Sequence, residues 1–303
     1  MSGTTALSPW LPTAPCTPGH CAAHPESVPW PNGAGPELAG AFRAVIRLIA
    51  GLGTVLLGLL LAPPAGLLPA ATRLALVRYW MRAVVRAFGV HVRYEGGVPA
   101  PAGGPLLVVA NHVSWLDIPL IAAVLPGRTV AKAEVRRWPV LGTLAALGGT
   151  LFIDREGIMA LPATVRTMAG ALAGGGRVVV FPEGSTWCGR ERGRFRPAAF
   201  QAALDAGCAV QPVRLDYRPT DAAAYVGADP LGSSLWRVVS TRRLTAVVRL
   251  GEPLPAARYP DRRALAAAAQ RAVASDSANL PSLSVHQRSR SRSASASSAR
   301  TPA

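Results

Sequence analysis

From residue 90 to residue 276 the chain alternates short apolar runs with stretches whose apolar residues recur at helical spacing. The apolar runs predict strands at Val90–Tyr94, Leu106–Ala110, Thr129–Ala131, Thr150–Ile153, Val178–Phe181, Ala209–Leu215 and Ala246–Leu250. The periodic stretches predict helices at Leu116–Val124, Val140–Leu147, Leu161–Ala173 and Ala198–Ala206, with another near Arg262–Ser275. This alternation is typical of the α/β class. We therefore expect a mixed, largely parallel sheet flanked by helices, with functional side chains at the carboxyl ends of its strands.

The segment before this domain is apolar without alternation. No charged side chain occurs between Leu48 and Thr72, although Pro63-Pro64 interrupts the run. A helix over residues 48–62 would be roughly 22 Å long, short of the ~30 Å hydrocarbon core, unless Arg47 snorkels and the residues before it join the helix. The pattern leaves two alternatives: a marginal transmembrane helix, or a helix that enters the bilayer and returns.

The stretch from Thr72 to Gly89 carries two stripes at helical period. The apolar stripe is Leu74, Val77, Met81, Val84, Val85 and Phe88, and the basic stripe is Arg78, Arg82 and Arg86. Taken alone, this fits an interfacial helix with Trp80 at headgroup level, or equally a helix packed on the sheet with a solvated arginine face. Its position directly after the apolar run favours an N-terminal membrane-associated helical motif over residues 41–89.

The net positive charge of the chain narrows the class of partner only in part. Lys and Arg number 32 and Asp and Glu 16, a net charge of +16 in a chain that is 50% hydrophobic. Such a balance suits anionic lipid surfaces as well as nucleic acid. We expect disorder in the Pro/Gly/Ala-rich arm of residues 1–40 and in the Ser/Arg-rich tail of residues 277–303. The tail could bind RNA, but a solvated tail is the simpler interpretation, so we expect a membrane surface and no nucleic acid as partner.

The four cysteines favour a reduced compartment over a disulfide-stapled secreted fold. Cys16, His20, Cys21 and His24 lie close enough in sequence to share a metal ion. Their spacing matches no familiar structural zinc site, so we expect no metal. Nucleotide phosphate loops and the Gly-x-Ser-x-Gly nucleophile motif are missing from the sequence, and we predict no cofactor.

The sequence VVANHVSWLDIPLI places chemistry at the end of the strand Leu106–Ala110. His112 would lie on the turn and Asp117 in the first turn of the next helix, which Ser114 could cap. The carboxylate could then fold back to accept one imidazole N–H. That arrangement fixes the tautomer and leaves the other ring nitrogen basic, as general-base activation of a hydroxyl requires. The alternative is a buried histidine satisfied by local hydrogen bonds.

A second strand ends in Phe-Pro-Glu-Gly-Ser-Thr. Gly184 permits close approach of the backbone, and Ser185, Thr186 and neighbouring N–H groups could bind an anion. Glu183 could orient a substrate hydroxyl or organise the loop. The alternative is a plain turn between strand and loop.

Two further strand ends carry cations. Arg155 follows the strand Thr150–Ile153 and could serve as a forked phosphate ligand, although a surface ion pair is the commoner use of such a residue. Lys132 follows Thr129–Ala131. Together the four strand ends predict a site for a substrate that carries both a phosphate and a hydroxyl.

The motifs NHVSWLD, GTLFIDR, FPEGST and AVQPVRL follow one another in the order and rough spacing of the glycerolipid acyltransferase family. The resemblance is to bacterial 1-acyl-sn-glycerol-3-phosphate acyltransferases and covers approximately Val90 to Pro253, inside an expected catalytic domain of residues 90–276. The His-x4-Asp and Phe-Pro-Glu-Gly motifs are specific as a pair.

The resemblance implies transfer of a fatty acyl group from acyl-CoA or acyl carrier protein to the free sn-2 hydroxyl of 1-acylglycerol-3-phosphate, giving phosphatidate. It implies that His112 is the general base, that Asp117 orients it, and that the hydroxyl attacks the thioester without an acyl-enzyme. Arg155, Glu183 and Gly184 would bind the phosphate region of the acceptor. The expected location is the cytoplasmic face of the cytoplasmic (inner) membrane.

The chain departs from the family pattern at two places. Trp187 follows Ser185-Thr186 where members commonly carry arginine, and Pro197 stands in a segment where Phe-Lys-x-Gly is usual. Both changes concern the acceptor more than the chemistry. A lyso-ornithine lipid, whose headgroup has no glycerol phosphate, is therefore the alternative acceptor. A non-enzymatic membrane or RNA-binding module would leave the intact His-x4-Asp pair unexplained.

Overall fold

The computed structural model describes residues 16, 38–96, 104–138, 141–153 and 160–275. Its strands are β1 (Val90–Gly96), β2 (Leu106–Ala110), β3 (Arg128–Lys132), β4 (Leu151–Ile153), β5 (Arg177–Val180), β6 (Ala209–Arg218), β7 (Leu244–Leu250) and β8 (Leu254–Pro255). Its α-helices are α2 (Leu38–Ala65), α3 (Ala70–Ala87), α4 (Asp117–Ala122), α5 (Leu141–Leu147), α6 (Leu161–Ala173), α7 (Ala198–Asp205), α8 (Thr220–Ala223), α9 (Leu231–Ser240) and α10 (Arg262–Ala274). Short 3-10 helices lie at Ala133–Arg137 and Ala256–Arg258.

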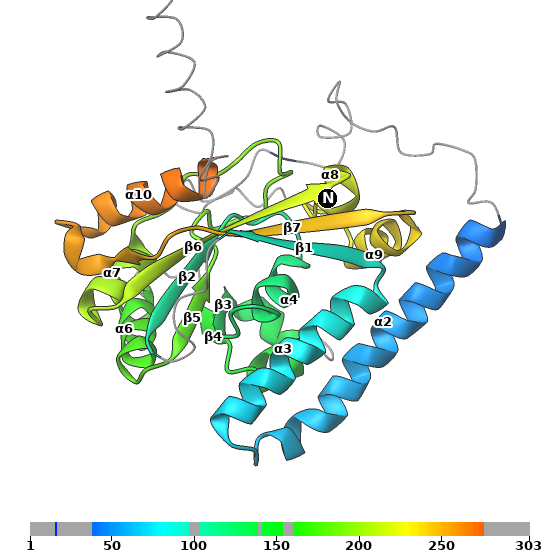
Figure 1. Cartoon of the computed structure of the whole chain (residues 1–303), viewed down its shortest axis with the longest axis horizontal. Coiled ribbons are helices and arrows are strands. Elements are labelled where there is room, and N and C mark those ends of the chain that lie inside the picture. Colours follow the sequence, from blue (N-terminus) through cyan, green and yellow to red (C-terminus); the bar gives the residue numbers. More distant parts are fainter. Residues whose placement is uncertain (1–15, 17–37, 97–103, 139–140, 154–159, 276–303) are drawn as a thin grey trace, which may run out of the picture.

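One sheet organises the fold, in the order β1-β7-β6-β2-β5-β3-β4, with β8 paired to β6 (Figure 1). The neighbours pair in parallel except at β6–β7 and β6–β8, which are antiparallel. The predicted mixed, largely parallel sheet is therefore confirmed. Since β2, β3, β4 and β5 run in the same direction, their carboxyl ends lie at one edge of the sheet.

Two apolar clusters cover the two faces of the sheet. Along β2, Leu106, Val108 and Ala110 face the cluster that contains α3, α4 and α9. Leu107 and Val109 face the cluster that contains α6, α7 and α10. A strand buried on both faces is apolar at every position, which explains why this strand reads as an unbroken apolar run.

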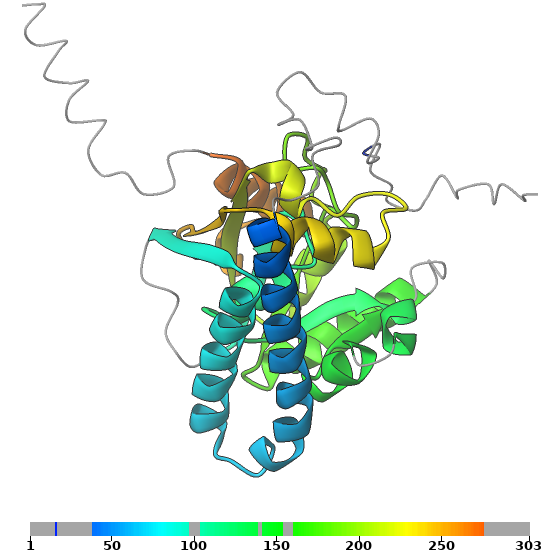
Figure 2. The ribbon, with the colours of Figure 1, turned by 90° about the vertical axis from the view of Figure 1, so that its right-hand side faces the viewer.

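Helices α2 and α3 form an antiparallel hairpin that extends away from the sheet (Figure 2). Glycines on α2 allow the close packing. A Cβ at Gly51 would lie 2.4 Å from the Phe88 ring, and one at Gly58 would lie 2.5 Å from Nε1 of Trp80. The other face of α2 and the tip of the hairpin expose apolar side chains, among them Leu52, Leu56, Leu57, Leu60, Leu61, Leu67 and Leu68.

The first helix is longer than the sequence pattern indicated. It begins at Leu38 and ends at Ala65, so Pro63-Pro64 occupy its last turn. Among the described helices, only the stretch Ala39–Ala65 is long and apolar enough to cross a membrane, with a mean hydropathy of 2.3. Only 11% of its apolar window is buried in the protein, which is consistent with membrane association.

Arg47, for which snorkelling was considered as a way to lengthen the apolar run, is bound to the protein instead. Its guanidinium donates to the carbonyl oxygens of Val239 at 3.1 Å, Thr241 at 2.8 Å and Arg242 at 3.3 Å, at the C-terminal end of α9. The Trp80 indole packs against α2, and its placement at headgroup level stays a prediction. These contacts attach the hairpin to the α/β domain.

Candidate active site

A buried asparagine follows β2 and joins it to β6. The Asn111 side chain donates to the carbonyl oxygen of Leu215 and accepts from the Leu215 N–H, both at 2.8 Å. A side-chain amide that pairs with both backbone groups of one residue continues the sheet ladder where the backbone of β2 turns away. The chain then places His112 just beyond this fixed point.

His112 and Asp117 form the predicted pair. Nδ1 of His112 lies 2.8 Å from Oδ2 of Asp117, and this oxygen also accepts the N–H groups of Val113 at 2.7 Å and Ser114 at 2.9 Å. Oδ1 accepts the hydroxyl of Tyr217. Asp117 is fully buried, so these four donors hold its carboxylate in one orientation.

The hydrogen-bond partner fixes the histidine tautomer. A carboxylate only accepts hydrogen bonds, so Nδ1 of His112 carries its proton and Nε2 keeps a lone pair. The imidazole stacks on Phe181 with ring centroids 4.1 Å apart and planes 17° from parallel, and its side chain is 20% exposed. An oriented, partly accessible imidazole with a free Nε2 lone pair is suited to accept a proton from a hydroxyl.

The Phe-Pro-Glu-Gly loop after β5 joins the loop after β2 directly. Oε2 of Glu183 accepts the His112 N–H at 3.3 Å, and the Trp187 N–H donates to the His112 carbonyl at 2.8 Å. Gly184 takes a φ of +77°, which favours glycine, and its N–H donates to the Phe181 carbonyl at 3.1 Å. Ser185 and Thr186 follow, half-buried, beside this turn.

Glu183 has an unusual protonation equilibrium. Burial raises the pKa of its carboxyl to about 8, and the nearby Asp117 carboxylate adds to the rise. Hydrogen bonds from the N–H groups of His112 and Gly193, together with the charge of Arg192, oppose it. A protonated Glu183 is neutral at pH 7 and can donate a hydrogen bond as well as accept one. Burial and Asp117 likewise raise the pKa of Tyr217, which keeps that hydroxyl a donor to Asp117.

The pKa of Glu183 predicts a pH-dependent stability. The unfolded chain ionises this group near its ordinary value of 4.5, whereas the folded chain holds the proton to about 8. Between these two pKa values the folded state therefore binds more protons than the unfolded state, and the free energy of unfolding falls as pH rises through this range. In Glu183→Gln the fall disappears. We expect the wild type to lose roughly 2–3 kcal/mol more than the variant between about pH 6 and pH 8.

The measurement is denaturant unfolding in detergent at both pH values. Glu191→Gln, which removes the same charge from an exposed side chain, is the matched control. Equal pH slopes in the wild type and in Glu183→Gln would mean that Glu183 is ionised throughout.

Of the two predicted cationic residues, Lys132 and Arg155, the structure describes only Lys132. Lys132 ends β3 and is paired in register with Ile153 at the end of β4, so it lies at the same edge of the sheet as the dyad, with an exposed side chain. No contact joins Lys132 to the dyad among the described residues. Arg155 lies outside the described residues. Of the possible metal ligands in the N-terminal arm, only Cys16 is described; it is buried near Cys188 and Val226.

Several residues of the site were missed from sequence. Tyr217 and Asn111 were not predicted, and neither was the support of Trp115, which lies between His112 and Asp117. The Trp115 indole N–H donates to Ser234 Oγ on α9 at 3.2 Å, and its ring meets the edge of Phe88 with centroids 5.4 Å apart. Asn111 precedes His112 in the motif, but its hydrogen bonds to Leu215 on β6 could not be predicted from the motif alone. Tyr217 and Ser234 gave no local signal.

A family model and several known proteins match this chain. The acyltransferase family model matches residues 91–216, which include the dyad and both strand-end loops. A lyso-ornithine lipid O-acyltransferase of Pseudomonas aeruginosa is 40% identical over 242 residues, covering 76% of this chain and 92% of the relative. The chain belongs to the glycerolipid acyltransferase family.

Other relatives of this acyltransferase carry a different acceptor in their names. A 1-acyl-sn-glycerol-3-phosphate acyltransferase of Neisseria gonorrhoeae is 38% identical over 195 residues, covering 61% of this chain and 76% of the relative. The crystal structure of the 1-acyl-sn-glycerophosphate acyltransferase PlsC from Thermotoga maritima has the same fold, with a TM-score of 0.60, 19% identity, and coverage of 78% of this chain and 94% of that one.

Proposed function

We propose that this acyltransferase moves a fatty acyl group from acyl-CoA or acyl carrier protein to the free hydroxyl of a lysolipid. The observation that carries the proposal is the hydrogen bond from His112 Nδ1 to Asp117 Oδ2, which leaves Nε2 as the proton acceptor. His112 removes the proton of the acceptor hydroxyl as its oxygen attacks the thioester carbonyl. The thiolate leaves and takes up a proton, and no acyl-enzyme forms.

The first proposed acceptor is 1-acylglycerol-3-phosphate, with transfer to its sn-2 hydroxyl to give phosphatidate. Lys132, Arg155, Glu183, Gly184, Ser185 and Thr186 are its proposed ligands. The parallel strand ends support this, because they bring Lys132 and the Glu-Gly loop to one edge of the sheet. In this site a protonated Glu183 would donate to a substrate oxygen rather than repel a phosphate.

A lyso-ornithine lipid is the second proposed acceptor. Two observations favour it: the extent of similarity to a relative named for that reaction, and Trp187 in place of the usual arginine. The Trp187 indole packs against Gly193, where a Cβ would lie 2.4 Å from Nε1. An apolar ring at this position supplies no charge for a phosphate.

The hairpin of α2 and α3 is proposed to enter the bilayer with its tip and return, on the cytoplasmic face of the cytoplasmic membrane. Arg47, in the first half of α2, and Phe88, after the end of α3, both contact the α/β domain, so the apolar tip of the hairpin is the part proposed to contact lipid. The proposed organisation is a membrane hairpin at residues 41–89 and a catalytic domain at residues 90–276, between the arm of residues 1–40 and the tail of residues 277–303.

The test offers lysophosphatidate and lyso-ornithine lipid side by side to membranes that contain the protein, with a labelled acyl thioester as donor. We expect labelled diacyl product from at least one acceptor and none in His112→Ala. Product from one acceptor alone identifies the substrate. The proposal fails if neither lipid, nor any other lysolipid, is acylated above the level of the His112→Ala membranes.

A further inference from the structure

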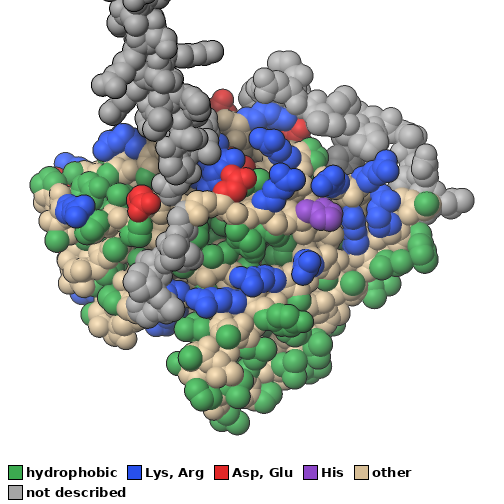
Figure 3. Space-filling view, in the orientation of Figure 1, with side chains coloured by type: hydrophobic (Ala, Val, Ile, Leu, Met, Phe, Trp, Pro, Cys, Tyr) green, Lys and Arg blue, Asp and Glu red, His purple; other side chains and the backbone are tan. Residues whose placement is uncertain are grey.

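One face of the sheet beside the dyad is polar and open. Along β6, Val213, Leu215 and Tyr217 face the apolar cluster with α3, α4 and α9, whereas Arg214, Asp216 and Arg218 face the opposite side. A cleft of about 440 Å³ lies on that opposite side, over β6 and β7. Its volume is in the range of small-molecule sites. Figure 3 shows basic side chains gathered over this part of the molecule.

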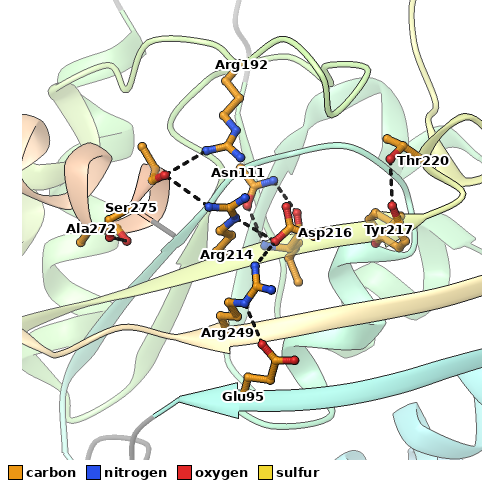
Figure 4. Close-up of polar contacts among 12 residues, drawn as sticks. Glu95, Asn111, Arg192, Arg214, Asp216, Tyr217, Thr220, Arg249, Ala272 and Ser275 are labelled. Carbon is orange, nitrogen blue, oxygen red and sulfur yellow. Dashed lines mark hydrogen bonds and ion pairs between the residues drawn. The ribbon is translucent and has the colours of Figure 1, made fainter. Parts of the chain in front are cut away.

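An ordered network of charges forms the cleft wall. Oδ2 of Asp216 accepts from Nε of Arg214 at 2.8 Å and from Nη1 of Arg249 at 2.6 Å, and Nε of Arg249 donates to Glu95 at 2.8 Å (Figure 4). Arg218 also lines the cleft, and its side chain is exposed. The lining carries three arginines and one aspartate, 3 − 1 = +2, and Glu95 beside it, which pairs with Arg249, lowers the net charge of the network to +1. Asp216 orients the guanidinium groups of Arg214, which also donates to the Ala274 carbonyl at 3.2 Å, and of Arg249, which also donates to Glu95. Oriented guanidinium groups of this kind bind phosphate oxygens through their remaining N–H groups.

The cleft borders the loop that carries the dyad. Val113, the residue after His112, and Tyr217 line it and both donate hydrogen bonds to Asp117, but His112 and Asp117 are not part of the lining. From Arg218 to Arg214 the strand extends about 13 Å at 3.3 Å per residue, so the arginines follow an elongated path along the cleft. We expect an elongated anionic ligand bound along this path to extend past Val113 toward His112.

Direct transfer requires the donor and the acceptor at His112 together. The proposed acceptor ligands lie at the ends of β3 and β5, on one side of β2, whereas the cleft lies on the other side, over β6 and β7. The donors share one chemical feature. In both acyl-CoA and acyl carrier protein, the thioester is at one end of a 4′-phosphopantetheine arm and a phosphate is at the other.

We propose that the cleft binds the 4′-phosphopantetheine arm of the acyl donor, with its phosphate held by Arg218 and the Arg214–Asp216–Arg249 network. This inference rests on the proposed acyl transfer. It assigns Arg218 and Arg249 to the donor rather than to the lysolipid.

The test compares donors with and without the phosphate. Arg218→Gln and Arg249→Gln are assayed with palmitoyl-CoA, palmitoyl carrier protein and phosphate-free palmitoyl-pantetheine, and Arg166→Gln, an exposed arginine on α6, is the matched control. We expect KM for palmitoyl-CoA to rise about tenfold in both cleft variants, the value of one charge-assisted hydrogen bond, with kcat nearly unchanged. KM for palmitoyl-pantetheine and for the lysolipid should stay as in the wild type.

The assay with palmitoyl carrier protein shows which phosphate of the donor the cleft binds. An equal rise for both phosphorylated donors supports the phosphate of the arm itself, whereas a rise for palmitoyl-CoA alone would overturn that assignment in favour of the nucleotide end. Similar changes for palmitoyl-pantetheine, or no change for either phosphorylated donor, would overturn the assignment.

Calorimetry of CoA binding to the wild type and to Arg218→Gln gives a readout without turnover. Tenfold weaker binding in the variant supports the cleft even if the lysolipids tested are not acylated. Equal affinity of the wild type and Arg218→Gln for CoA refutes the proposed donor cleft even if the lysolipids are acylated.

Discussion

His112→Ala is expected to lower acyl transfer by at least about 10³-fold while leaving membrane binding intact. The variant loses the imidazole whose Nε2 is proposed to accept the proton of the hydroxyl. No other histidine lies in the described loops at this edge of the sheet to replace it. Removing a ring that is 20% exposed opens no sealed cavity, so the fold should persist. The rate is measured with saturating donor and acceptor, and vesicle flotation checks membrane association.

His91→Ala is the matched control, because His91 is exposed on β1. Its activity should equal that of the wild type. Near-normal turnover in His112→Ala would remove the general-base mechanism and restore the interpretation of this residue as structural.

Asp117→Asn is expected to lower kcat by about 10²- to 10³-fold with little change in KM or in thermal stability. The amide oxygen can take the place of Oδ2 and accept from His112, Val113 and Ser114, while the amide N–H group faces the Tyr217 hydroxyl, which can accept it. The geometry therefore survives. What is lost is the negative charge that stabilises the imidazolium formed as His112 takes the proton.

Steady-state kinetics and a thermal melt measure the two effects separately. Asp205→Asn makes the same change on α7, outside the site, and should be silent. A large drop in melting temperature together with lost activity would assign Asp117 to folding of the loop, and unchanged kcat would remove it from catalysis.

Local patterns predicted the fold and the centre of the site well. The strand Leu106–Ala110 and the helix Leu161–Ala173 have the predicted bounds, because an abrupt polar residue or a glycine run marks their ends. The His112–Asp117 pair was also predictable, since its five-residue separation lets a turn and one helical turn bring both side chains together.

Long-range partners were not predictable in this way. Tyr217 reaches Asp117 from 100 positions away, and nothing near Tyr217 in sequence marks that contact. The helix α9 escaped prediction because its segment, LGSSLWRVVS, is rich in serine and β-branched residues. Tertiary contacts support it there, with Arg47 at its end and Trp115 on Ser234.

The contacts of Trp115 connect the loop of His112 and Asp117 to the apolar hairpin. They run from Arg47 through α9 to Ser234, from Ser234 to Trp115, and from Trp115 through Phe88 back to Gly51 on α2. This closed set of contacts fixes the position of His112 relative to the tip of the hairpin in the structure. On the proposed membrane placement, the depth of the tip would set the height of His112, and the acceptor hydroxyl would have to reach that height to be acylated.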